Sequence, residues 1–130
     1  MKTTESLAVA RMVDDAGYDG MICADHLIYP RDLRSPYPSP TGKPGWQPET
    51  AWPDTWVMIG AMAAVTTRLR FSNAVYVAPA RPLIEVAKVV ATAASLSDGR
   101  VSLASESVGC VRNTSCWVRS SATAASVWTR

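Results

Sequence analysis

The sequence has little of what metal centres and polyanion-binding surfaces are built from. Its 130 residues include one histidine and three cysteines, and the formal net charge is +2. The three cysteines do not stand at the spacing of metal ligands, so we expect no metal site. A net charge this small, without a basic stripe that carries interleaved aromatic residues, gives no support for a nucleic-acid partner.

Long apolar runs are also absent. No segment reaches the roughly 20 consecutive apolar residues that a membrane-spanning helix needs. Charged residues between Glu5 and Asp15 interrupt any apolar core near the N-terminus, so that region lacks the pattern of a signal peptide. We therefore expect a cytoplasmic location and no membrane partner. The length suits one compact domain.

A short apolar run that ends in a charged pair is the most informative stretch. Residues 20–24 read Gly-Met-Ile-Cys-Ala and predict a buried strand, although periodicity alone also allows a helical segment. Asp25 and His26 follow directly. Chemistry in α/β folds collects at the carboxyl ends of parallel strands, so this pair is a candidate catalytic site. In the alternative interpretation, Asp25 caps a turn and His26 is a structural residue.

The rest of the pattern alternates helices and strands. Apolar residues recur at helical spacing in residues 5–16, and Gly17 stands where a helix C-terminus favours a left-handed residue. Asp54 is a good N-cap for the helix that follows it. Strands linked by helices imply parallel pairing, so the predicted fold class is α/β. The elements expected after the first strand are a Pro-rich loop at 30–53, a helix at 54–67, a strand at 69–77, a helix at 82–96 and a strand at 100–104.

The connection at residues 30–53 is long and holds seven of the nine prolines, together with Tyr37, Trp46 and Trp52. Loops of this length inside a compact domain are usually functional or disordered. Aromatic residues among the prolines favour a loop that folds back on the rest of the chain. Two interpretations stay open: a lid that covers a substrate, and a packed or mobile insertion. A polyproline docking segment, which would make the chain a small binding module, has only this loop in its favour.

Short motifs follow one another along the chain in a characteristic order. They are Ala16-Gly17-Tyr18-Asp19-Gly20, Ala24-Asp25-His26, Arg31-Asp32-Leu33-Arg34-Ser35-Pro36-Tyr37-Pro38, Trp52-Pro53-Asp54, Ala63-Ala64-Val65-Thr66-Thr67-Arg68-Leu69 and Leu96-Ser97-Asp98-Gly99-Arg100-Val101. In order and spacing, these motifs resemble the luciferase-like monooxygenase superfamily. Within it, they resemble the branch that uses the deazaflavin coenzyme F420. The resemblance covers residues 5 to about 103.

The resemblance implies both a fold and an activity. The family fold is a (β/α)8 TIM barrel of roughly 250 residues, so residues 1–104 would form about half of a barrel that begins at the family's first helix. The activity would be that of an F420-dependent oxidoreductase, with hydride transfer between the cofactor and a small organic substrate. A flavin-dependent monooxygenase that uses FMN is the alternative. Members of the family are often homo-oligomers.

The resemblance also implies roles for individual residues. His26 would be the proton donor or acceptor beside the cofactor ring, and Asp25 would orient His26 or form a hydrogen bond with the cofactor. Family members carry a bulge on the third barrel strand, often with a cis peptide bond that does not precede proline, and this bulge backs the ring. In this chain the bulge falls at Ala74, Val75 and Tyr76, which are the expected cofactor contacts. The alternative for these residues is an ordinary strand.

Residues 105–130 do not resemble the family. No acidic residue occurs from Ser107 to Arg130, and Ser, Thr, Arg, Cys and Trp crowd together without a helical or strand period. Synonymous codons for this tail, read from the third base, spell a Gly-x-Gly-x-Gly-Trp segment and then an acidic amphipathic stretch, as in the family. We therefore hypothesise a frameshift near Leu103 and Ala104, and we expect the tail to be disordered or arbitrarily packed.

An incomplete barrel predicts a second outcome for the chain as written. Native domains are stable by only about 5–15 kcal/mol. The loss of half of the strand pairings would exceed that margin. The 130-residue product would then be a non-functional truncated fragment, which is the alternative to an active oxidoreductase.

Overall fold

The computed structural model describes residues 4–29, 36–37 and 39–105. Residues 106–130, which include nearly all of the predicted non-family tail, fall outside the described residues, as do residues 30–35 of the Pro-rich loop. No helix within the described ranges has both the length and the apolar character to cross a membrane. The elements, in chain order, are the helix α1 (Glu5–Asp15), the strand β1 (Gly20–Cys23), the helix α2 (Thr55–Ala63), the strand β2 (Arg70–Asn73), the 3-10 helix η1 (Ala78–Ala80) and the helix α3 (Leu83–Leu96).

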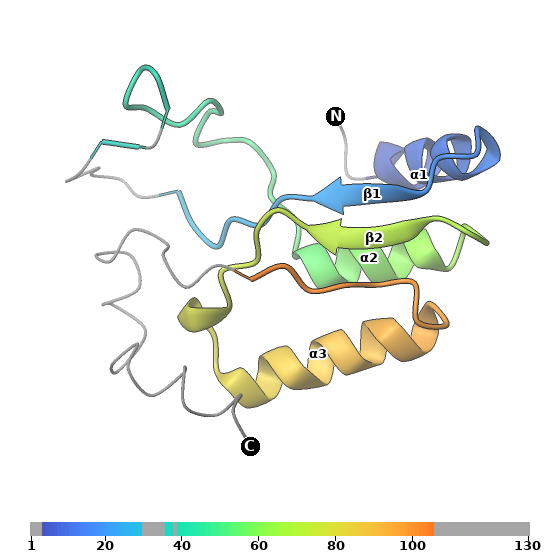
Figure 1. Cartoon of the computed structure of the whole chain (residues 1–130). Helices are drawn as coiled ribbons and strands as arrows, with labels where there is room; N and C mark the ends of the chain where they lie inside the picture. Colours follow the sequence, from blue (N-terminus) through green and yellow to red (C-terminus); the bar gives the residue numbers. More distant parts are fainter. Residues whose placement is uncertain (1–3, 30–35, 38, 106–130) are drawn as a thin grey trace.

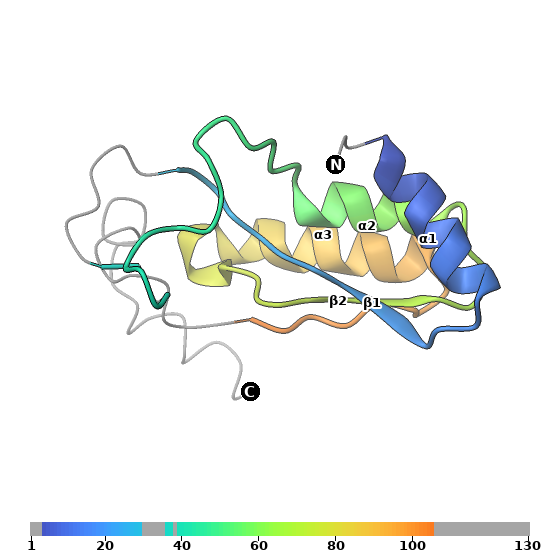
Figure 2. The same ribbon diagram turned by 90° about the horizontal axis from the view of Figure 1, so that it is seen from above.

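The two strands pair in parallel along their whole length, as the helix-linked order predicts. After α3 the chain returns beside β2 in an extended segment, which forms parallel bridges from Val101 to Phe71 and from Ser105 to Tyr76 (Figure 1). Seen from above, the helices lie on one side of this sheet, and no described element covers its other face (Figure 2). The fold is therefore a sheet with one covered face and one open face.

The turn between α1 and β1 depends on Gly17. Its φ angle is +83°, in the left-handed region that glycine enters without a steric cost. The Gly17 N–H donates to the Asp14 carbonyl at 3.0 Å, and the Tyr18 N–H donates to the Val13 carbonyl at 3.2 Å. This pair of bonds is the Schellman pattern that ends many helices. It confirms the predicted end of the first helix and directs the chain into β1.

The second helix is shorter than predicted. It ends at Ala63 rather than at residue 67. The Arg100 guanidinium donates through Nη2 to the carbonyls of Ala63 and Thr66, at 2.9 and 3.2 Å. The backbone N–H groups of residues 67–69 donate to the carboxylate of Asp14 instead of to helix carbonyls. Both partners lie far away in the sequence, and together they end the helix early.

The second predicted strand, at residues 69–77, is also shorter in the structure. Regular pairing with β1 ends at Asn73. The peptide bond between Ala74 and Val75 is cis, at the position where the family resemblance places such a bond. The chain bends at Ala74 and pairs again only at the isolated bridge of Tyr76, so the prediction of a continuous strand to residue 77 was wrong.

The last predicted strand is present only as an extended segment with isolated bridges. The Phe71 N–H donates to the Arg100 carbonyl at 2.8 Å, and the Tyr76 N–H donates to the Ala104 carbonyl at 2.8 Å. The bend at Ala74, after β2, lies between these two points of contact. The extended segment nevertheless runs parallel to β2, as predicted.

The core lies between the sheet and the helices. Trp56, Ile59 and Met62 of α2 are at most 2% exposed, whereas Val57 of the same helix is 68% exposed, so α2 buries one face in the core. On the uncovered side of the sheet, Ile22 is 67% exposed. The buried apolar residues that form the core are Ala10, Trp56, Ile59, Met62, Ala63, Leu69, Phe71, Tyr76, Val86 and Ala93.

Candidate functional site

The carboxyl ends of β1 and β2 lie at the same edge of the sheet, because the two strands are parallel. Asp25 and His26 follow β1 at this edge, and residues 74–76 follow β2. The helix α2 begins here as well, since the Thr55 hydroxyl donates to the Ala24 carbonyl at 2.8 Å. The fold therefore brings the predicted site residues of both strands to one edge.

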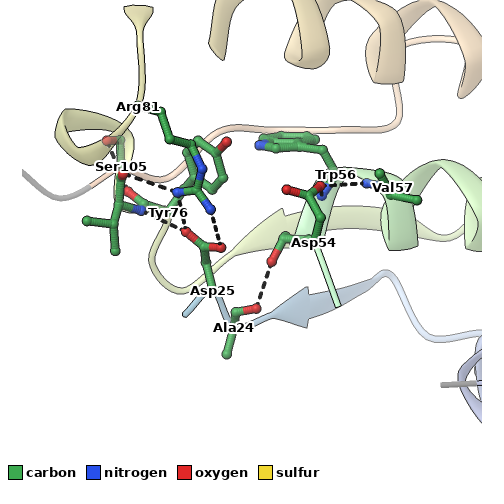
Figure 3. Close-up of polar contacts among 10 residues, drawn as sticks. Ala24, Asp25, Asp54, Trp56, Val57, Tyr76, Arg81 and Ser105 are labelled. Atoms are coloured by element: carbon green, nitrogen blue, oxygen red, sulfur yellow. Dashed lines mark hydrogen bonds and ion pairs between the residues drawn. The ribbon is translucent and has the colours of Figure 1, made fainter. Parts of the chain in front are cut away.

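Asp54 fixes the start of α2 at this edge. Its Oδ1 accepts hydrogen bonds from the N–H groups of Trp56 and Val57, at 2.9 and 3.0 Å (Figure 3). Two of the otherwise unpaired N–H groups of the first helical turn are satisfied in this way. The predicted N-cap is confirmed, and the first turn of α2 is held against the end of β1.

The carboxylate of Asp25 is buried and fully engaged. Its Oδ2 accepts from Nη1 of Arg81 at 2.7 Å and from the Val77 N–H at 3.1 Å, and its Oδ1 accepts from Nη2 of Arg81 at 2.8 Å (Figure 3). This is a two-pronged, charge-assisted ion pair. No hydrogen bond joins Asp25 to His26, both of which the structure describes. The predicted role of Asp25 in orienting His26 therefore has no direct contact to support it.

Arg81 belongs to this site although no sequence pattern above predicts it. Its guanidinium carbon lies 4.1 Å from the centroid of the Tyr76 ring. A usable signal did exist, because a buried carboxylate requires a partner. Arg81 is the basic residue closest in sequence to the end of the second predicted strand.

His26 is partly buried and packs against two tryptophans. Its ring centroid lies 4.1 Å from that of Trp46 and 4.4 Å from that of Trp52. Burial lowers the pKa of His26, and the negative charge of Asp25 acts in the opposite direction. The imidazole is therefore mainly neutral at physiological pH, and neutral imidazole is the form that accepts a proton.

Both tryptophans belong to the Pro-rich loop. Trp46 also contacts Tyr37 and Trp52, with centroid separations of 5.2 and 5.3 Å. These contacts confirm that the aromatic part of the loop folds back on the chain, and they place it over His26. Residues 30–35 and 38 of the loop lie outside the described residues, so the lid and the packed insertion both stay predictions.

Residues 74–76 divide between the surface and the core. Val75 is 37% exposed, whereas Tyr76 is only 2% exposed. Burial raises the pKa of the Tyr76 phenol, and the nearby charge of Arg81 opposes that effect. The Tyr76 carbonyl accepts a hydrogen bond from the Ser105 hydroxyl at 3.2 Å. Tyr76 thus supports Arg81 and the sheet, whereas Ala74 and Val75 are exposed and accessible to a ligand.

The chemistry of this edge fits the ring of a flavin or a deazaflavin. Ile22 and Val75 expose apolar side chains that suit the face of a planar ring. His26 supplies an imidazole that can exchange a proton. Asn73, at the end of β2, is 2% exposed, and both polar atoms of its amide lack a hydrogen-bond partner in the described part of the chain. The Asn73 amide therefore offers a hydrogen-bond donor and an acceptor that no described residue uses.

A cavity of about 330 Å³ lies next to this edge, between β1, α2 and the end of the Pro-rich loop. Cys23, Met58 and Trp52 are among its lining residues. Burial raises the pKa of the Cys23 thiol, so this side chain stays protonated at neutral pH. The largely apolar walls suit a small organic molecule. Across the described residues, no three His, Cys, Asp or Glu side chains gather where they could share a metal ion.

Comparison with known proteins gives a family match over most of the chain. The model of the family described as luciferase-like monooxygenase matches residues 1–104. An uncharacterized protein of Mycobacterium tuberculosis strain H37Rv is 37% identical over 98 residues, which cover 75% of this chain and 34% of that protein. A second uncharacterized protein of the same strain is 33% identical over 98 residues, covering 74% and 34%. The chain therefore spans about a third of the length of these relatives.

Two solved structures share the fold. Monooxygenase RslO1 from Streptomyces bottropensis matches with a TM-score of 0.64 at 18% identity, over 88% of this chain and 30% of that one. The oxygenating constituent of 3,6-diketocamphane monooxygenase from Pseudomonas putida, in complex with FMN, matches with a TM-score of 0.65 at 16% identity, over 88% and 26%. At these identities the likeness concerns the fold alone. It confirms the predicted α/β class and the partial (β/α)8 TIM barrel.

Proposed function

Because the chain belongs to the luciferase-like monooxygenase family, we propose that it forms part of the active site of an F420-dependent oxidoreductase. The reaction is hydride transfer between the deazaflavin and a small organic substrate. The observation that carries the proposal is the meeting of Asp25, His26 and residues 74–76 at one edge of a parallel sheet. The sequence motifs that resemble the F420-using branch favour this cofactor.

Each side chain at the edge has a proposed task. A bound deazaflavin supplies the carbon that accepts or donates the hydride. His26, as neutral imidazole, takes the proton that leaves the substrate on oxidation and returns it in the reverse direction. Trp46 and Trp52 keep water away from the imidazole. Asp25 holds the end of β1 in place beside the cofactor, and Val75 offers the ring an apolar contact.

FMN is the second candidate cofactor. The diketocamphane monooxygenase constituent that shares the fold has FMN bound. The two ring systems have similar outlines but different chemistry, because reduced flavin activates oxygen and deazaflavin does not do so readily. With FMN, the protein would be a flavin-dependent monooxygenase instead of a hydride-transferring oxidoreductase.

The third proposal is that the 130-residue chain alone is a non-functional fragment. It spans about a third of the length of its relatives. In TIM barrels, a phosphate site is frequently formed by the loops after the seventh and eighth strands, and no such loops occur among the described residues. A complete family member would bind the cofactor with the segment matched here and with the loops of its later strands. We expect such a protein to form homo-oligomers.

A fluorescence titration of the purified chain distinguishes these proposals. Trp46 and Trp52 lie beside His26, so a ring that docks at this edge quenches their emission. We expect F420 to bind with a dissociation constant at least about tenfold below that of FMN, which corresponds to about 1.4 kcal/mol. Tighter binding of FMN would favour the monooxygenase, and no quenching by either would favour the fragment. The control is the chain with both tryptophans replaced by Phe, whose remaining emission includes that of Trp56 at the start of α2 and should respond less.

A further inference from the structure

Arg81 makes a set of contacts that the proposed reaction does not explain. Its Nη1 and Nη2 donate to the two carboxylate oxygens of Asp25, at 2.7 and 2.8 Å. Nη1 also donates to the Val77 carbonyl at 3.2 Å, and the Val77 N–H donates back to Asp25 at 3.1 Å. The guanidinium, the carboxylate and the backbone N–H and carbonyl of Val77 therefore form a closed ring of hydrogen bonds, and Figure 3 shows the Arg81–Asp25 pair within it.

The ion pair is buried and has a fixed orientation. The side chains of Arg81 and Asp25 are 13% and 2% exposed. The guanidinium stacks on the ring of Tyr76, and the Arg81 N–H donates to the Ala78 carbonyl at 3.0 Å, which holds the backbone at the end of η1. Planar stacking together with two parallel hydrogen bonds suits a guanidinium and does not suit a lysine ammonium.

We propose that Arg81 is a positioning residue of the site, which compensates the charge of Asp25 so that His26 stays an uncharged imidazole able to accept a proton. This inference rests on the proposed function, in which His26 exchanges a proton with the substrate. An unpaired carboxylate next to an imidazole favours the protonated form of that imidazole. A carboxylate that is paired with a guanidinium exerts much less of this effect.

The groups around His26 explain why we assign the compensation of the Asp25 charge to Arg81. Asp25 precedes His26 in the chain and is the charged group, within the described residues, that shifts its pKa. Trp46 and Trp52, which pack against the ring from the loop, carry no charge. Burial disfavours the imidazolium, but a bare Asp25 carboxylate would work against burial. Arg81 weakens that opposition.

The chain has a single histidine, so one imidazole resonance reports its titration. NMR spectra of the full 130-residue chain are recorded from about pH 5 to about pH 8, the range in which histidine changes charge. We expect Arg81→Met to raise the titration midpoint of His26 by about one pH unit, and Arg81→Lys, which keeps the charge, to raise it by less. The matched control is Arg70→Met, at an exposed arginine at the start of β2, which should leave the midpoint unchanged.

A second background shows whether Arg81 acts through Asp25. In the Asp25→Asn chain, the further change Arg81→Met should move the midpoint by less than half as much as it does in the wild-type chain. This double variant buries no unpaired charge. If Arg81→Met alone does not fold, Arg81→Lys is compared in the two backgrounds instead, and an equal shift in both again contradicts the proposal. An unchanged midpoint in folded Arg81→Met, or an equal shift in both backgrounds, would overturn the proposal. No cofactor is needed here, so a failed F420 titration is distinguishable from a failure of this inference.

Discussion

Asp14 links the first helix to the beginning of β2. Its carboxylate accepts hydrogen bonds from the backbone N–H groups of Thr67, Arg68 and Leu69, at 2.6, 3.1 and 2.8 Å. These bonds, with that from Thr67 the strongest, lower the pKa of Asp14 although burial acts to raise it. The charged form is thus the one that the fold requires. A single side chain therefore sets how β2 approaches α1.

Replacement of Asp14 by Asn should destabilise the fold at neutral pH. In the folded chain the pKa of Asp14 lies below its ordinary value of 3.8. Its contribution is therefore fully present above that value and is lost as the pH falls through the lowered pKa. Urea midpoints of the variant and the wild-type chain should differ at neutral pH and converge in strong acid. Asp15→Asn, at an exposed neighbour, is the control, and a difference that does not change with pH would contradict the assignment.

The pKa of His26 can be followed through its neighbouring indoles. Burial places it below the ordinary value of 6.5, and the Trp46 ring lies 4.1 Å away. Protonated imidazole quenches indole emission. Tryptophan fluorescence should therefore fall as the pH is lowered, with a midpoint below 6.5, and His26→Gln should abolish that step. A midpoint at or above 6.5 would mean that burial is not the dominant effect on this residue.

At the scale of the elements, local signals predict where helices begin and turn, but not always where they end. Asp54 and Gly17 act on backbone groups within one turn of themselves, so their effect is readable from the sequence. The end of α2 depends on Arg100 and Asp14, which lie 37 and 53 residues from the groups that they bind. No local periodicity carries information about such distant partners, so the helix was predicted too long.

The candidate site also contains residues that a local sequence pattern predicts and residues that depend on distant partners. Asp25 and His26 could be predicted because they directly follow an apolar strand. Arg81 could not be predicted by pattern alone, because it binds Asp25 across 56 residues of sequence. Trp46 and Trp52 were recognised only as aromatic residues of a loop. Their place beside His26 depends on the path of that loop, which its proline content does not specify.

Arg100 is the element-scale counterpart of Arg81, because it joins the end of α2 to the turn after α3. Arg100→Lys should lower the free energy of unfolding by about 2 kcal/mol or more. One lysine ammonium cannot donate to all of the acceptors that the Arg100 guanidinium binds. Equilibrium urea denaturation measures the loss. Arg70→Lys, at an exposed position, is the control, and a loss within about 0.5 kcal/mol would contradict this role. The acceptors of the Arg100 side chain are the carbonyls of Ala63, Thr66, Leu69 and Ser97 and the Thr66 hydroxyl.

At the scale of the whole molecule, the described chain is a sheet with helices on one side only (Figure 2). Within the described residues, β1 has a strand neighbour on one edge alone. Parallel strands in α/β proteins are normally covered on both faces. The curated relatives are about three times as long as the matched segment. We expect an additional strand of these relatives to pair with the free side of β1, opposite β2. The further strands would then enclose the open face of the sheet.

The frameshift hypothesis concerns the tail that follows this partial barrel. The family match ends at residue 104. If a frameshift produced residues 105–130, the gene's bases, read from the third position of each codon, should spell Gly-Val-Gly-Val-Gly-Trp and then an acidic stretch. Sequencing of the gene checks this, and bases that cannot encode that string would refute it. The same shifted frame across residues 82–96 should give no family-like string, which serves as the control.

The capped start of α2 has a consequence for how any cofactor lies on the barrel. The first turn of a helix is its partially positive pole, and this pole often attracts phosphate groups. In this chain the Asp54 carboxylate already occupies that pole, and its negative charge repels a second anion. If a cofactor ring docks beside β1 as proposed, its anionic tail would be repelled by Asp54 and would need cations from other segments of the barrel.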